Sequence, residues 1–307
     1  MLTIGSRGSQ LALWQANWVK SRLEALGTDC RIEIIKTTGD KIQDVPLAKV
    51  GTKGLFTKEI EEALLAGAID LAVHSLKDLP TVLPEGLTLA AIPEREDVRD
   101  ALVGRKLDEL AAGAKVGTSS LRRAAQLRAL RPDLAVETIR GNVDTRLRKQ
   151  AEGQYAAIVL AAAGLRRLGW ADRIAELLEP ERMCPAVGQG ALAIETRGDG
   201  GVGQRTCEQL NHAETRAAVT AERAVLGTLG GGCQVPIGAH ATLDGDAMRL
   251  RAVVISPDGV TLIKRESSGS AAVAERLGRE LAEELLAAGG RAILDAVYNK
   301  DIGKLQV

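Results

Sequence analysis

The stretch of sequence that decides the fold is IDLAVHSLKDLP, residues 69–80. It begins as a short apolar run of the kind that fills a buried strand, and it then becomes polar. Leu79 precedes a proline, which disfavours helix, so Lys77 and Asp78 are predicted to lie in a turn just past the carboxyl end of that strand. In open α/β sheets, ligands bind at this edge. Asp78 is therefore a candidate for facing a cationic ligand, although an aspartate in a turn also commonly hydrogen-bonds its own backbone.

Strands and helices alternate on both sides of this stretch. Residues 2–4 are predicted as a strand, and residues 11–26 as a helix with Ser9 as its N-cap. This places Arg7 and Ser9 at a strand-to-helix junction, where free backbone N–H groups favour an anion. Arg7 could equally be a solvated surface arginine. The other elements predicted in this part of the chain are strands at 32–34 and 87–92 and a helix at 58–66.

A polar run at residues 94–100 is predicted to cross into a second α/β lobe. A Gly/Pro-bounded connector at 185–190 leads out of that lobe, and residues 191–195 predict a strand that returns to the first one. Residues 198–203 are predicted to form a mobile surface loop. The elements expected within the second lobe are strands at 115–117, 136–139 and 156–160 and helices at 121–130, at 142–150 and from 164 onward.

From His212 the pattern changes to that of a small α+β domain. A helix through Leu226 precedes short strands with turns at 244–245 and 258–259, and residues 271–288 predict one amphipathic helix. A chain of 307 residues is too long for a single ordinary core. We therefore predict an α/β fold with two lobes and a C-terminal α+β domain, divided as residues 1–93 with 191–210, 97–186 and 213–307.

The composition limits the classes of function. Lysine plus arginine equals aspartate plus glutamate at 40 each, so no global field favours nucleic acid or membrane. The four cysteines form no CxxC pair and there are three histidines, which predicts a reduced, cytoplasmic protein without a bound metal. No signal core or membrane-length apolar run is apparent. Few aromatic rings are present on which the bases of a single strand could stack.

The strongest local signal is a cluster of cations. Between Lys115 and Gln150 there are nine basic and three acidic residues, in an otherwise neutral protein. Arg122 and Arg123 fall in the first turns of a predicted helix, where cations oppose the helix dipole by a few tenths of a kcal/mol each. An anion bound between them would explain this arrangement, and the planar guanidinium suits carboxylate or phosphate. Arg140 and Arg146 are predicted near the same edge, and solvated surface charge is the alternative for all four.

Two loops carry further candidates. Cys233 follows three glycines, so its thiol is unshielded and could be alkylated in a cleft, although no nearby cation lowers its pKa and an inert cysteine is the alternative. Residues 43–56 are long, without clear periodicity, and contain Lys49 and Lys53. Loops of this length in compact domains are often lids or binding loops.

Seven motifs occur in an order that resembles the porphobilinogen deaminase (hydroxymethylbilane synthase) family over nearly the whole chain. They are LALWQA at 11–16, PLAKVGTKGLF at 46–56, VHSLKDLP at 73–80, VGTSSLRR at 116–123, RGNVDTR at 140–146, PAVGQG at 185–190 and GGCQVP at 231–236.

The resemblance implies two lobes of the periplasmic-binding-protein type around a cleft, with the third domain carrying the cysteine. It implies that Cys233 holds a dipyrromethane cofactor through a thioether. Four porphobilinogen molecules would be added head to tail with loss of ammonia, and water would release hydroxymethylbilane. It also gives Asp78 the catalytic role, since a fixed carboxylate stabilises the cation that forms when the aminomethyl group loses ammonia.

Each pyrrole carries an acetate and a propionate, so a growing chain of rings needs an array of cations and hydrogen-bond donors. The residues expected to bind cofactor or substrate are Arg7, Ser9, Lys77, Thr118, Ser119, Ser120, Arg122, Arg123, Arg140, Arg146 and Gln189, with Lys49 and Lys53 acting from a lid and Arg167 contacting substrate as it enters.

Two other classes of function remain possible from the sequence. A two-lobed binding protein could trap a small dicarboxylate in a basic cleft without catalysis, although such proteins are usually exported. A nucleic-acid binder could use the basic segment, which would make duplex binding strongly salt-dependent. We expect a monomer that takes porphobilinogen as its small-molecule substrate, with no nucleic-acid or membrane partner.

Overall fold

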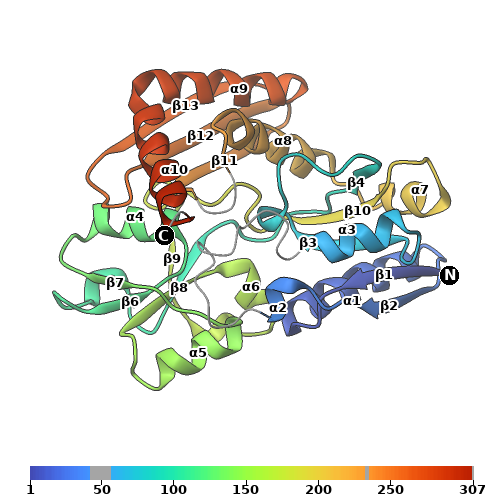
Figure 1. Cartoon of the computed structure of the whole chain (residues 1–307), viewed down its shortest axis with the longest axis horizontal. Helices are drawn as coiled ribbons and strands as arrows, with labels where there is room; N and C mark the ends of the chain where they lie inside the picture. The colour runs from blue at the N-terminus through green and yellow to red at the C-terminus, as the bar shows by residue number, and fades with distance from the viewer. Residues whose placement is uncertain (42–56, 232–234, 306–307) are drawn as a thin grey trace.

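The computed structural model describes residues 1–41, 57–231 and 235–305, and three β-sheets organise this part of the chain (Figure 1). The predicted α/β class is confirmed, because two five-stranded mixed sheets with helices packed on them form two lobes. A three-stranded antiparallel sheet with its own helices forms the C-terminal unit. No helix within the described ranges has the length and apolar character needed to cross a membrane.

The first sheet has the strand order β2-β1-β3-β10-β4. Its first three strands run parallel, whereas β10 pairs antiparallel with both β3 and β4. The predicted return of the chain to the first lobe is thus confirmed. The bounds of the strands are β1 Leu2–Ser6, β2 Cys30–Ile34, β3 Leu71–Ser75, β4 Leu87–Ala91 and β10 Leu192–Arg197.

Helices cover this first sheet. Ser9 caps α1 as predicted, because its hydroxyl accepts a hydrogen bond from the Ala12 N–H at 3.3 Å. The expected mobile loop at 198–203 is wrong in part, since a helix begins at Val202. The Gly201 N–H binds Asp199 at 2.7 Å, and the fully buried Cys207 anchors the helix to the core. The helices are α1 Gln10–Ala25, α2 Thr38–Lys41, α3 Lys58–Leu65 and α7 Val202–Glu208.

The second sheet has the order β7-β6-β8-β5-β9. In it β6 runs parallel to β7 and β8, and β5 is antiparallel to β8 and β9. Strand β9 was not predicted; Gly169, at a φ of +73°, follows α6, and the chain then pairs along β5. The bounds are β5 Asp100–Val103, β6 Lys115–Gly117, β7 Ala135–Glu137, β8 Ala157–Ala161, β9 Ile174–Leu178, α4 Leu121–Leu130, α5 Val143–Ala151 and α6 Ala162–Arg167.

The third sheet has the order β11-β12-β13, and the predicted turns at 244–245 and 258–259 join its strands. Helices α8 and α9 pack closely, because a Cβ at Gly278 would lie 2.2 Å from the Ala221 carbonyl oxygen. The helix predicted at 271–288 is present, with α9 as its main part, whereas α10 was not predicted and follows a kink at Gly289, which has a φ of +106°. The bounds are β11 Ile237–Asp244, β12 Ala247–Ile255, β13 Leu262–Ser270, α8 Ala213–Thr228, α9 Ala274–Leu285 and α10 Arg291–Leu305.

Short helical turns complete the described elements. The 3-10 turn η2 directly follows β3 and contains Lys77 and Asp78, so the predicted turn at the carboxyl end of this strand is confirmed. The bounds of these turns are η2 Leu76–Asp78, η3 Leu107–Glu109, η4 Ala171–Arg173, η5 Ala271–Val273 and the π-helical η6 Leu286–Gly290.

Candidate active site

The carboxyl ends of parallel strands carry most of the predicted site residues. In the first lobe, Arg7 and Ser9 follow β1, and Lys77 and Asp78 follow the adjacent parallel strand β3. All four therefore belong to one edge of the first sheet. Gln15, on α1, supports this edge by donating from its buried amide to the Ser75 hydroxyl at 2.9 Å.

The second lobe repeats the arrangement on its parallel strands. Segments after the carboxyl ends of β6, β7 and β8 lead into α4, α5 and α6. These segments and the helices that follow carry the predicted residues Thr118, Ser119, Ser120, Arg122, Arg123, Arg140, Arg146 and Arg167.

The edges of the two sheets face each other, as the electrostatics around Lys77 show. Burial lowers the pKa of Lys77 to about 8; the neighbouring Asp78 opposes this shift, and Arg123 in the second lobe adds to it. Asp78 in turn acts on Arg123 and Arg146 across the interlobe space. Asp78 itself is exposed, whereas Lys77 is half-buried. The fold therefore places an accessible carboxylate of one lobe opposite guanidinium groups of the other.

Arg146 projects from the first turn of α5 and is partly withdrawn from water. Burial lowers its pKa to about 10, and the positive charges of Arg123 and Arg140 add to this shift. Its Nε–H donates to the Gly141 carbonyl at 2.8 Å. Gly141 has a φ of +110°, and a Cβ there would lie 2.6 Å from Thr145, so only glycine suits this turn. Like charges gathered in this way favour a bound anion.

The Thr118–Ser120 segment forms the start of α4 through its hydroxyl groups. Ser120 caps the helix by accepting from the Arg123 N–H at 3.4 Å, as predicted. Thr118 accepts from the Ser120 N–H at 3.2 Å, and the Ser119 hydroxyl donates to the Ile139 carbonyl. These contacts fix the backbone that carries the two arginines.

Arg122 and Arg123 lie against a buried carboxylate that the sequence analysis did not identify. Asp100, the first residue of β5, is fully buried and accepts from Arg122 Nη1 at 2.7 Å and from Arg123 Nε at 2.8 Å. Burial would raise the pKa of Asp100, but the two arginines hold it well below its ordinary range. The protein itself therefore supplies, through Asp100, part of the negative charge expected between these arginines.

Gln189 completes this cluster from the connector between the lobes. Its fully buried amide donates to Asp100 Oδ1 at 2.9 Å and to the Val98 carbonyl at 2.6 Å. Its amide oxygen accepts from Arg123 Nη2 at 3.3 Å. The Gln189 side chain therefore joins the arginine pair to Val98, which lies in the other segment between the lobes, residues 94–99.

Arg167 joins the lobes at a neighbouring position. Its Nη2 donates to the Gly190 carbonyl at 2.7 Å, and its guanidinium lies over the Trp14 ring of α1, 5.9 Å from the centroid. Burial lowers its pKa to about 10, against the opposing charge of Glu96. The contacts of Arg167 are thus distinct from those of the Asp100 cluster.

Three predicted residues, Lys49, Lys53 and Cys233, lie outside the described residues. The other three cysteines, Cys30, Cys184 and Cys207, are free and buried. Burial raises the pKa of both Cys184 and Cys207 to about 12, so neither is a thiolate at neutral pH.

The residues present fit a group that carries several carboxylates. Lys77, Arg123, Arg140 and Arg146 supply positive charge around Asp78, and the buried Arg122 Nε has no acceptor among the described residues. Within the same residues, no cluster of His, Cys, Asp or Glu could hold a metal ion.

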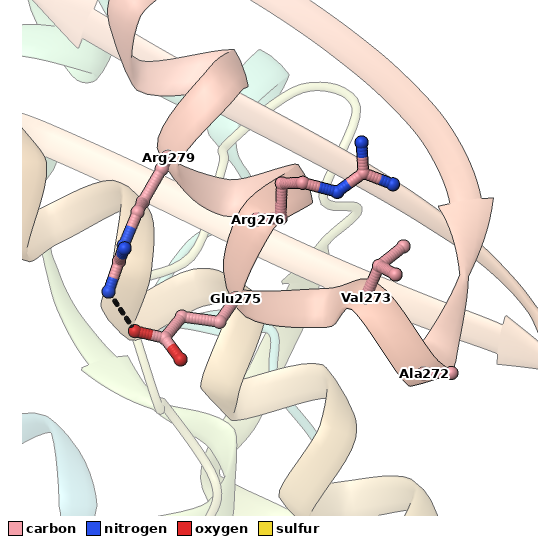
Figure 2. Close-up of a pocket in the computed structure, with 5 residues that line it drawn as sticks. All are labelled: Ala272, Val273, Glu275, Arg276 and Arg279. Carbon is pink, nitrogen blue, oxygen red and sulfur yellow. Dashed lines mark hydrogen bonds and ion pairs between the residues drawn. The ribbon is translucent and has the colours of Figure 1, made fainter.

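A surface hollow elsewhere, on α9, is unlike this site (Figure 2). It contains none of the residues predicted for binding, and its Arg279 pairs with Glu275 on the same helix. Its lining residues are Ala272, Val273, Glu275, Arg276 and Arg279.

The facing strand ends of the two α/β lobes bring one exposed carboxylate together with several guanidinium groups. This arrangement defines a class of protein that binds polyanionic small molecules. Family models described as "Porphobilinogen deaminase, dipyromethane cofactor binding domain" and "Porphobilinogen deaminase, C-terminal domain" match residues 2–202 and 216–287. The chain belongs to the porphobilinogen deaminase family.

Curated relatives agree over almost the full length. Porphobilinogen deaminase from Trichlorobacter lovleyi is 56% identical over 305 residues, covering 98% of each chain. The protein of the same name from Syntrophobacter fumaroxidans is 52% identical over 303 residues, covering 97% of this chain and 98% of the relative. Among solved structures, a periplasmic substrate-binding protein of an ABC transporter from Coxiella burnetii is 12% identical, with a TM-score of 0.45 over 73% of this chain and 97% of that one.

Proposed function

We propose that this chain is a porphobilinogen deaminase, a transferase of tetrapyrrole and haem biosynthesis. It condenses four porphobilinogen molecules head to tail on a covalently bound dipyrromethane primer, with loss of ammonia, and releases hydroxymethylbilane by hydrolysis. The observation that carries the proposal is the position of Asp78, an exposed carboxylate of one lobe within electrostatic reach of Arg123 and Arg146 of the other.

The primer is attached through a thioether to Cys233 in this proposal. When bound, the dipyrromethane supplies the nucleophilic pyrrole terminus to which substrate is joined. The cationic groups around Asp78 hold the acetate and propionate groups, because guanidinium forms paired hydrogen bonds with carboxylate. The residues assigned to cofactor or substrate binding are Arg7, Ser9, Lys49, Lys53, Lys77, Thr118, Ser119, Ser120, Arg122, Arg123, Arg140, Arg146, Arg167 and Gln189.

Asp78 is the catalytic residue. Its carboxylate stabilises the positive charge that develops on the substrate pyrrole as the aminomethyl group loses ammonia, since a fixed charge there costs no reorganisation in the transition state. Asp78 is exposed, so substrate can reach it, and Lys77 beside it balances the charge in the ground state. The same carboxylate is placed to move protons when the new bond forms.

The sheet membership supports a division into three domains at residues 1–93 with 191–210, 97–186 and 213–307. The cofactor would then lie between the first two domains and be attached to the third. We also propose a cytoplasmic monomer, with free buried thiols and a balanced charge in support. Sedimentation of the purified chain tests the monomeric state.

Intact-mass spectrometry with a substrate assay tests the function directly. The purified chain should carry the mass of two pyrrole units, and it should consume porphobilinogen with release of ammonia. The matched Cys233→Ser variant should lack the added mass. A chain without the adduct that binds small dicarboxylates and leaves porphobilinogen intact would contradict the proposal and favour a binding protein.

A further inference from the structure

The contacts of Arg123 show which part of its guanidinium remains for a ligand. Its Nε–H binds Asp100 at 2.8 Å, its Nη2 lies 2.7 Å from the same carboxylate and 3.3 Å from the Gln189 amide oxygen, and its Nη1 donates to the Val159 carbonyl at 3.2 Å. Three of these contacts are hydrogen bonds, and they leave one N–H on Nη1 and one on Nη2. An incoming anion would therefore meet Arg123 at the remaining N–H groups of Nη1 and Nη2.

Asp100 determines this orientation from a rigid position. It begins β5 directly after the crossing segment 94–99, and it pairs through β5 with both β8 and β9. Its carboxylate also accepts from Gln189, which belongs to the second crossing segment, 185–191. The direction of the arginine pair is thus tied to both segments that join the lobes.

The charge balance of the cluster leaves a requirement for an anion. One buried carboxylate faces two buried guanidinium groups, while the neighbouring charges of Lys77 and Asp78 offset each other. Buried charges are strongly unfavourable unless they are paired, so a carboxylate from a ligand would neutralise the excess. Asp100 therefore holds the two arginines in place but neutralises only one of their two positive charges.

We propose that Asp100 is a positioning residue for cofactor and substrate binding, in that its buried carboxylate directs the remaining N–H groups of Arg123 toward the carboxylates of the bound pyrrole chain. This inference rests on the proposed function. No contact of Asp100 with the reacting atoms is implied, because its oxygens are fully buried against Arg122, Arg123 and Gln189.

The test compares Asp100→Asn, which keeps the size of the side chain, with Asp100→Glu, which keeps its charge. Far-UV circular dichroism and thermal unfolding first establish that each variant folds. We expect the fraction of Asp100→Asn chains that carry the dipyrromethane mass to fall by about tenfold or more, and the loaded fraction to show a raised KM for porphobilinogen with a smaller change in kcat. Asp100→Glu should restore most of the loading.

A matched control separates the effect of the arginine pair from that of the crossing segment 94–99. Asp97 lies in the same crossing segment and pairs with Arg99 at 2.8 Å and Arg166 at 2.9 Å, with no contact to Arg122 or Arg123 among its described hydrogen bonds and ion pairs. Asp97→Asn should load like the wild type. An equal loss in Asp97→Asn, full loading with unchanged KM in Asp100→Asn, or a loss confined to kcat would each overturn the proposal.

If Asp100→Asn does not fold, the double variant Asp100→Asn/Arg122→Gln provides the test, because it removes one charge of each sign. We expect this double variant to fold but to load little cofactor. Failure of both to fold would assign Asp100 to folding alone and overturn the inference. The wild type measured in parallel separates failure of the proposed function from failure of the role of Asp100. An unloaded, inactive wild type refutes the proposed function, whereas an active wild type beside a normal Asp100→Asn refutes only the role of Asp100.

Discussion

Arg95 and Glu222 form a buried ion pair at the point where both lobes meet the C-terminal unit. The Arg95 guanidinium donates to the two Glu222 oxygens at 2.7 and 3.0 Å and to the Gln189 carbonyl at 2.7 Å. Glu222 also accepts from the Gly188 and Ala241 N–H groups at 2.8 and 2.9 Å. The pair therefore connects both crossing segments, 94–99 and 185–191, to α8 and β11.

Removing the positive partner should destabilise the whole chain. Arg95→Gln leaves the fully buried Glu222 without its counter-ion, which typically costs about 3–5 kcal/mol of unfolding free energy. Urea denaturation measures the change. The control is Arg276→Gln, which breaks an exposed pair with Glu280 on α9 and should cost about 0.5 kcal/mol at most. Equal losses in the two variants would contradict a junction role for Arg95.

The catalytic assignment of Asp78 predicts a loss of turnover without a loss of cofactor. Asp78→Asn keeps the shape of the side chain and removes the charge that stabilises the developing cation, so kcat should fall by roughly two to four orders of magnitude. Intact mass should still show two added pyrrole units. Asp133→Asn, at an exposed aspartate paired with Arg131, is the matched control and should turn over normally. Near-normal rates in Asp78→Asn would refute the assignment.

Local sequence signals predicted the elements but not the contacts between them. The caps at Ser9 and Ser120 and the turn at Asp78 follow from residue types within a few positions, and the structure has all three. The Asp100 cluster joins positions 22, 23 and 89 residues apart, so no periodicity reports it. The one available signal was an acid at the start of the apolar run Ala101–Val103, a placement that requires a buried partner.

The elements missed by the sequence analysis depend on their neighbours in the same way. Strand β9 has no alternation of polar and apolar residues, and its pairing with β5 defines it. Helix α10 continues beyond Gly289, a residue that reads as a helix end in the sequence, because the chain only kinks there.

The arginine array predicts that assembly of the cofactor depends on Arg123. Arg123→Leu removes the guanidinium whose charge acts most strongly on Lys77, so the chain should fold but remain without the dipyrromethane mass. Arg128→Leu is the control on the same helix; Arg128 donates to the Pro257 carbonyl at 2.8 Å, away from the site. A fully loaded Arg123→Leu chain, measured by intact mass, would contradict binding by the array.

Lys77 should make the stability of the cofactor-free chain depend on alkaline pH. Its folded pKa of about 8 lies below the value of about 10.4 expected for an unfolded lysine. Between these values the unfolded chain binds more protons than the folded chain, so the contribution of Lys77 to the free energy of unfolding rises with pH. Denaturation of the wild type and of Lys77→Met across this range measures the contribution, which should be missing from the variant.

The same titration should act in the opposite direction on cofactor assembly. As pH rises through about 8, Lys77 in the cofactor-free chain loses the charge that attracts pyrrole carboxylates, so the rate of gain of the dipyrromethane mass should fall. Carboxylates raise the pKa of a neighbouring ammonium, so the loaded enzyme should keep its activity to higher pH. Lys77→Arg retains a charge throughout and should lose the alkaline fall in assembly rate. If that variant keeps the same fall near pH 8, another group must be responsible.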